Sequence, residues 1–188
     1  MENILTKKDI QAYKRISFNR AKTNIIGWFV VTILIETGLR AQELLNLKWS
    51  DYDKKNCLFN IIGKGNKERN IIISNYLYES LRYYVKHHKY ISKANIKTSD
   101  HVIVSELGTH LTTRDIRRIV ERELIESIGK TSTFPHMLRA SFCTSLLEGG
   151  AEVMEVQKMM GHSRLETTSI YYRKTIESKR TLINQYLN

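Results

Sequence analysis

The feature that most constrains this chain is an apolar run at residues 25–35, which reads IIGWFVVTILI. The run is far shorter than the roughly 20 residues that a membrane-spanning helix needs. A helix that is apolar on every side is normally buried in the middle of a protein. We therefore expect a helix over residues 25–37 at the centre of the core. Gly38 follows it directly and can take the left-handed backbone that ends a helix.

Helix signals recur on both sides of this run. Thr6 and Asp9 have the spacing of a capped helix start. Residues 112–128 begin in the same way and carry an apolar stripe at helical spacing. Pro135, the only proline, suits the first turn of another helix. Further helices are expected at residues 39–47, at residues 75–91 and in a short segment that Gly161 ends.

Two β-prone runs, residues 57–62 and 69–74, flank a segment rich in Gly and Lys and predict a hairpin. Residues 51–56 have the composition of a turn, and residues 101–105 predict a third, short strand. No repeat, low-complexity tract or linker interrupts the chain. The expected fold class is α+β: mainly α-helical with a small antiparallel β-sheet, in one domain covering residues 1–188.

The balance of charge indicates the kind of partner. The chain has 30 Lys and Arg against 19 Asp and Glu, a formal net charge of +11. A surface this basic attracts polyanions, of which nucleic-acid backbones are the commonest. Charge alone leaves open the alternative of a highly charged but otherwise ordinary globular domain.

Several classes of protein are disfavoured. Cys57 and Cys143 fit no metal-binding or disulfide pattern, and the segment from Met1 onward does not resemble a secretion signal. His87 and His88 point to different sides of one helix, and no carboxylate cluster suggests a two-metal nuclease. We expect a cytoplasmic protein with reduced thiols, no membrane contact, no metal and no small-molecule cofactor.

The chemically richest stretch is residues 134–172. It holds His136 and Arg139 three residues apart at the start of an expected helix, where an anion is favoured. His162 and Tyr171 follow in the same stretch. Two imidazoles, a guanidinium and a phenol are groups that can hold a phosphodiester and attack it without a metal.

Four segments resemble the catalytic domain of the tyrosine recombinases, the family of phage lambda integrase and the bacterial chromosome-dimer resolvases, and they occur in that family's order. They are TGLRAQEL at residues 37–44, GKGNKER at residues 63–69, HMLR at residues 136–139, and the stretch from Gly161 to Tyr171. The resemblance implies the family's catalytic fold and a site-specific recombinase that cuts and rejoins DNA.

The resemblance also implies the nucleophile. Tyr171 would attack a DNA phosphate, forming a 3′-phosphotyrosine and releasing a 5′-hydroxyl. Tyr172 stands beside it, and the spacing from His162 favours Tyr171. For a tyrosine considered alone, a partly buried structural role is the commoner outcome.

The remaining catalytic roles follow from the same resemblance. Arg40 and Arg139 would grip the non-bridging phosphate oxygens, and Glu43, one turn after Arg40, would orient it. His136 and His162 would donate to the phosphate or accept the tyrosine proton, with the division between them left open. Lys64 would protonate the leaving 5′-oxygen. A solvated lysine in a hairpin turn is the plainer alternative.

Other basic residues are expected to touch the DNA backbone, although solvated charge is the default for each. They are Lys67, Arg69, Arg114, Arg117 and Arg118. The tail at residues 174–188 has an apolar helical pattern, and it would dock on a neighbouring protomer or on its own domain.

The expected partners are double-stranded DNA and further copies of the chain, as dimers or tetramers on DNA. We expect a recombinase of a phage or mobile element, without the amino-terminal DNA-clamping domain of full-length family members. Two alternatives stay open: a catalytically idle DNA-binding remnant and a relaxing enzyme of the type IB topoisomerase kind. A helix-turn-helix reader at residues 138–160 is disfavoured, because its second helix offers Glu152 and Glu155 to DNA and only Lys158 as a base.

Overall fold

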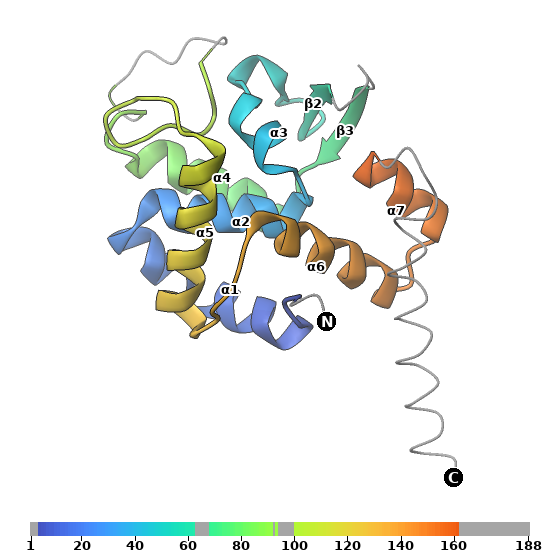
Figure 1. Cartoon of the computed structure of the whole chain (residues 1–188). Coiled ribbons are helices and arrows are strands. Elements are labelled where there is room, and N and C mark those ends of the chain that lie inside the picture. The colour runs from blue at the N-terminus through green and yellow to red at the C-terminus, as the bar shows by residue number, and fades with distance from the viewer. Residues whose placement is uncertain (1–3, 63–67, 92, 94–99, 162–188) are drawn as a thin grey trace.

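The computed structural model describes residues 4–62, 68–91, 93 and 100–161. Helix α2 (Ile25–Thr37) lies in the middle and is buried along nearly its whole length. It packs against α1 (Lys7–Thr23), α4 (Asn75–His87), α5 (Thr113–Ile128) and α6 (Pro135–Glu148) (Figure 1). The predicted central helix is confirmed, because an all-apolar helix is stable only when other elements cover every side.

The predicted helix starts at Thr6 and Thr112 are also confirmed. The hydroxyl of Thr6 accepts the backbone N–H of Asp9 at 3.2 Å, and the Asp9 carboxylate accepts the N–H of Thr6 at 2.9 Å. Thr112 and Asp115 repeat this arrangement at the start of α5. Each pair satisfies amide groups that the first helical turn leaves free.

The chain turns sharply between α2 and α3, at residues 38–40. Gly38 has φ 62°, and the backbone of Arg40 is extended. Helix α3 (Ala41–Asn46) is therefore shorter than the predicted 39–47. Arg40 occupies its N-cap position and Glu43 its third residue.

The sheet has three antiparallel strands in the order β1 (Tyr52–Asp53), β2 (Leu58–Ile62) and β3 (Glu68–Ile72), and the short 3₁₀ helix η1 (Trp49–Asp51) precedes it. The predicted hairpin is confirmed, with Leu58 opposite Ile72 and Ile62 opposite Glu68. The fold is thus mainly α with a small antiparallel sheet.

The prediction of a strand at residues 101–105 was wrong. The third strand is β1, in a segment predicted as a turn, and His101 forms only an isolated bridge with Lys48. Val102 and Ile103 are buried in an irregular segment, and the N–H of Val102 donates to the carbonyl of Leu47 at 2.8 Å. Their apolar character reflects burial in the core, not pairing in a sheet.

Helix α4 ends at His87 instead of the predicted 91. The buried ring of His88 accepts the N–H groups of Tyr90 and Ile91 through Nδ1, both at 3.3 Å. In a continued helix these N–H groups would donate to carbonyls four residues earlier. The imidazole therefore replaces the next helical turn.

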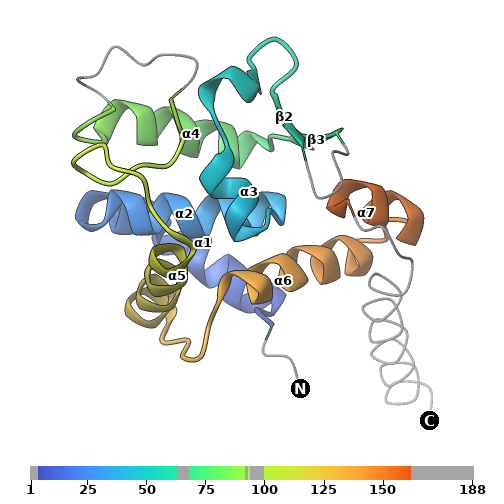
Figure 2. The same ribbon diagram turned by 45° about the horizontal axis from the view of Figure 1, so that its top comes forward.

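Helix α7 (Val153–Met160) follows the Gly149–Gly150 turn and ends at Gly161, which has φ 62°. It packs against both α6 and β3 (Figure 2). This placement brings the end of α7 close to the corner between α2 and α3, from which Arg40 projects.

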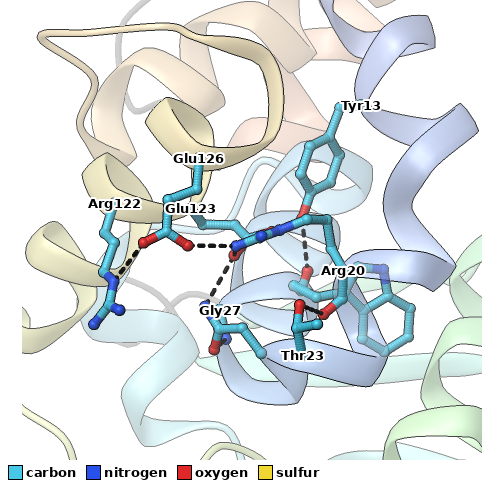
Figure 3. A network of polar contacts seen from close by, with 9 residues as sticks. Tyr13, Arg20, Thr23, Gly27, Arg122, Glu123 and Glu126 are labelled. Carbon is cyan, nitrogen blue, oxygen red and sulfur yellow. Dashed lines mark hydrogen bonds and ion pairs between the residues drawn. The ribbon is translucent and has the colours of Figure 1, made fainter.

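A polar cluster joins α1 to α5 (Figure 3). Arg20 donates to both oxygens of the fully buried Glu123, each at 3.0 Å, and Asn24 donates to the same carboxylate at 2.9 Å. The Glu123 carboxylate raises the pKa of Arg20 above its ordinary value. The cluster pairs a buried charge with its counter-charge and fixes the start of α2 against α5.

No helix within the described residues is both long and apolar enough to cross a bilayer.

Candidate functional site

Arg40 and Glu43 are joined at the start of α3. The Glu43 carboxylate accepts the backbone N–H of Arg40 at Oε2 and its Nη1 at Oε1, both at 2.8 Å. The side chain of Arg40 is 38% exposed, whereas that of Glu43 is 9% exposed. Glu43 therefore holds a guanidinium that still faces solvent.

Arg69 approaches the same carboxylate from β3. Its Nη1 donates to Oε1 of Glu43 at 3.0 Å and its Nη2 donates to Oε2 at 2.8 Å. The side chain is only 8% exposed. The sequence predicted that Arg69 touches the DNA backbone, whereas in the structure its side chain lies in a forked ion pair with Glu43.

The four hydrogen bonds decide the protonation state of Glu43. Burial acts to raise the pKa of Glu43, but donation from Arg69 and from the Arg40 backbone outweighs it and lowers the pKa to about 2. The carboxylate is therefore charged at neutral pH.

Arg139 reaches the same corner from α6, and only 3% of the residue is exposed. Its Nη1 donates to the carbonyl of Gly38 and its Nη2 to the carbonyl of Met160, both at 2.5 Å. Burial, with the like charge of Arg40 beside it, lowers the pKa of Arg139 to about 10. The guanidinium remains protonated at neutral pH, and within the described residues no carboxylate forms an ion pair with it.

The structure thus brings together three guanidinium groups and one carboxylate from α3, β3 and α6. The charges of Arg40, Glu43 and Arg69 all affect the pKa of Arg139, so the four groups form one electrostatic unit with an excess of positive charge. A groove of about 580 Å³ opens beside Arg40. Besides Arg40 and Glu43, its lining comprises the polar Gln42, Asn46, Lys48, Asp51 and Asn60 and the apolar Leu47, Ile61 and Ile62. Such an arrangement suits an anion with oxygen acceptors, such as a phosphodiester.

The other predicted residues that the structure describes lie at the surface. His136 is exposed in the first turn of α6, three residues before Arg139. Arg114, Arg117 and Arg118 are exposed on α5, and Arg118 donates to Asp115 at 3.2 Å. These positions are compatible with DNA contact and equally with solvation.

Four predicted residues lie outside the described residues: Lys64 and Lys67 in the hairpin turn, and His162 and Tyr171 after α7. The predicted tail at residues 174–188 lies outside them as well. Their roles therefore stay predictions from the sequence.

Within the described ranges, no three His, Cys, Asp or Glu side chains are grouped so that they could hold a metal ion. The expectation of a reaction without metal or cofactor stays a prediction.

Sequence reasoning missed the parts of this site that belong to the backbone. The carbonyls of Gly38, Met159 and Met160 each accept a hydrogen bond from Arg139 or Arg69. Every residue has a carbonyl, so no signal in the sequence could identify them. The left-handed turn predicted at Gly38 was the only hint of where one of them would lie.

Comparison with known proteins extends this picture. The model of the phage integrase family matches residues 4–178. The tyrosine recombinase XerC of Pediococcus pentosaceus is 35% identical over 159 residues, which are 84% of this chain and 52% of that protein. The chain spans about half the length of the curated relatives that it matches.

Solved structures agree on the fold. The crystal structure of XerA recombinase aligns with a TM-score of 0.79 and 28% identity, over 99% of this chain and 65% of that one. The post-cleavage complex of XerH site-specific recombinase with palindromic difH substrate aligns with a TM-score of 0.75 over 98% of this chain and 52% of that one. At 23% identity it supports the fold alone. Because the family model covers nearly all of the sequence and the XerC relative shares more than a third of its aligned residues, the chain belongs to the phage integrase family.

Proposed function

We propose that this chain is the catalytic domain of a site-specific DNA recombinase, which breaks and rejoins DNA through a 3′-phosphotyrosyl intermediate. The observation that carries the proposal is that the buried Arg139 donates to the carbonyl of Gly38, in the same corner as Arg40, beside an open groove. Two guanidinium groups from distant parts of the sequence therefore lie at one corner, which supports a site for a phosphodiester.

The proposed reaction exchanges one ester for another. The phenol oxygen of Tyr171 forms a bond to phosphorus, and the bond from phosphorus to the 5′-oxygen breaks. His136 or His162 takes the phenol proton, and Lys64 gives a proton to the leaving oxygen. Arg40 and Arg139 stabilise the negative charge that builds up on the non-bridging oxygens. The reverse sequence rejoins a strand, so the chemistry consumes no high-energy cofactor.

Double-stranded DNA is the proposed substrate, and dimers or tetramers on DNA are the proposed active species. The net charge of +11 supports binding to a polyanion. The pre-cleavage complex of XerH site-specific recombinase bound to difH substrate, which is 26% identical to this chain with a TM-score of 0.74, supports the same substrate class. Strand exchange between two sites needs one nucleophile for each strand, which accounts for the assembly.

Covalent trapping tests the proposal. The protein is incubated with a nicked DNA site whose cleaved end diffuses away, and the product is run on a denaturing gel. We expect a protein–DNA adduct that forms with chelator present, is lost in Tyr171→Phe and persists in Tyr172→Phe. Persistence of the adduct in Tyr171→Phe would overturn the assignment of the nucleophile.

The same experiment separates the alternatives. DNA binding without any adduct would point to an idle DNA-binding remnant. Rapid relaxation of supercoiled DNA without site preference would point to an enzyme of the type IB topoisomerase kind.

The origin of the recombinase is a finer proposal. Membership of a phage or another mobile element rests on how common such members are in the family. The test is the genomic DNA around the gene. Integration or transfer genes and flanking repeats would support the proposal, and a conserved chromosomal setting across strains that lack the element would refute it.

A further inference from the structure

We propose that Arg69 is a positioning residue for strand cleavage. It binds both carboxylate oxygens of Glu43, so that most of the Arg40 guanidinium stays available to the phosphate. It also links the start of α3 to the end of α7. The inference rests on the proposed function, because it concerns the same reaction. It also replaces the expectation that Arg69 grips the DNA backbone.

The donors of Arg69 are occupied by protein groups. Three of its nitrogens are engaged: Nη1 and Nη2 on Glu43, and Nε on the carbonyl of Met159 at 3.1 Å. With 8% of the side chain exposed, these donors face protein. The charge of Arg69 is already paired with the Glu43 carboxylate, whereas Arg139 donates only to neutral backbone carbonyls and so keeps its charge for an anion.

Arg69 and Arg40 share the carboxylate of Glu43. An arginine and a carboxylate pair most strongly through two parallel hydrogen bonds. Arg69 takes that arrangement on Glu43 and leaves Arg40 a single side-chain bond, from Nη1 to Oε1. Among the described residues, no other side-chain nitrogen of Arg40 has a hydrogen-bond partner. Without Arg69, we expect the Arg40 guanidinium to form two parallel hydrogen bonds with the Glu43 carboxylate and so to turn away from the groove.

Arg69 also contacts the carboxyl-terminal end of α7. The last carbonyls of a helix lack partners within the helix and carry partial negative charge. Here Arg69 binds the carbonyl of Met159, and Arg139 binds that of Met160. Arg139 also binds Gly38, as Arg69 binds Glu43. Each of the two arginines thus links the α2–α3 corner to the last turn of α7.

The packing at Gly161 leaves little freedom in this joint. A Cβ atom on Gly161 would lie 3.1 Å from Nη1 of Arg69 and 3.2 Å from its Cδ. The chain leaves α7 at Gly161 and continues to His162 and Tyr171 in sequence. Arg69 is therefore held between Arg40 and the point from which the proposed nucleophile segment departs.

The test compares Arg69→Lys and Arg69→Ala with the wild type in the trapping assay, using single-turnover cleavage at saturating DNA and a separate measurement of DNA affinity against salt. We expect both variants to lose about 100-fold in cleavage rate, the effect of a misplaced catalytic group. The lysine variant does not restore the rate, because an ammonium cannot fork onto Glu43. DNA affinity and its salt dependence stay close to those of the wild type.

A backbone-contact role predicts the opposite pattern and would overturn the proposal. In that case Arg69→Ala weakens binding and reduces the salt slope by about one unit, Arg69→Lys restores most of the affinity, and cleavage at saturating DNA is unchanged. Arg82→Ala is the matched control, because Arg82 is an exposed arginine paired with Glu79, and it should behave as the wild type.

Loss of the fold must be separated from loss of position. Circular dichroism and urea unfolding report whether each variant is folded. If Arg69→Ala is not folded, Arg69→Lys and Glu43→Gln carry the test, and their effects on cleavage should be strongly non-additive in the double variant because both act through Arg40. Additive effects would refute the inference that Arg69 and Glu43 both act on cleavage through Arg40. An absence of adduct in the wild type refutes the proposed function itself, whereas wild-type cleavage by Arg69→Lys refutes only this inference.

Discussion

Gly38 and Phe142 are in such close contact that a Cβ atom added to Gly38 would lie 2.5 Å from Cδ1 of the Phe142 ring. Gly38 also has φ 62°, a backbone conformation that side chains rarely tolerate. Its carbonyl, moreover, receives Nη1 of Arg139. At the end of α2, both the backbone conformation and the close contact with Phe142 require glycine, and the same residue binds Arg139.

This contact predicts that Gly38→Ala lowers the free energy of unfolding by about 3 kcal/mol, from strain in the left-handed conformation and overpacking against the ring. Urea unfolding measures the loss. The matched control is Gly129→Ala, because Gly129 ends α5 with φ 68° and has nothing within 4 Å of an added Cβ. It should lose only about 1 kcal/mol. Equal losses in the two variants would show that the contact with Phe142 is unimportant.

The cluster of Arg20 and Glu123 leads to a second prediction. Glu123→Ala removes the acceptor of Arg20 and Asn24 inside the protein. We expect it to destabilise the fold by about 3 kcal/mol, the usual cost of breaking a buried ion pair from one side. Thermal unfolding gives the measurement. Glu79→Ala breaks the exposed pair with Arg82 and should leave the melting temperature nearly unchanged.

The depressed pKa of Glu43 predicts how acid affects stability. The pKa of this carboxyl is lowered from an ordinary value of 4.5 to about 2 in the folded protein. The ionised form is therefore favoured by folding, and its contribution is present above about pH 5 and is lost as the pH falls toward 2. The shift corresponds to at most about 3 kcal/mol.

The measurement is urea unfolding of the wild type and Glu43→Gln from pH 7 down to pH 2. The difference in unfolding free energy between the two should be largest at neutral pH and should shrink steadily below pH 5. A difference that does not depend on pH would mean that the ionised form of Glu43 gains nothing from Arg40 and Arg69.

Thiol reactivity is a fourth, independent prediction. Cys143 is fully buried in α6, and this burial raises its pKa to about 11 although the nearby Arg139 acts in the opposite direction. Only the thiolate reacts readily, so native Cys143 should resist a disulfide reagent. Cys57 is partly exposed and should be modified first. Cys57→Ser tests the assignment: fast labelling of this variant in the native state would show that α6 opens readily.

Local signals determined much of the framework. The caps at Thr6 and Thr112, the proline at the start of α6 and the glycine after α2 each act within a few residues, so their effects could be predicted from the sequence. The pairing of Arg40 with Glu43 is local in the same sense, because three residues at the start of a helix bring the two groups together. The position of β1 could not be predicted in this way, since a two-residue strand exists only through its pairing with β2.

For the site, the sequence by itself supplied the candidate residues Arg40, Glu43 and Arg139 and the order of their motifs. Only the tertiary structure decided that Arg69 is buried on Glu43 and that Arg139 holds the carbonyls of Gly38 and Met160. These contacts join residues up to 101 positions apart. Burial and hydrogen bonding at such separations depend on how α6, α7 and β3 pack, and this packing has no signature in the neighbouring residues.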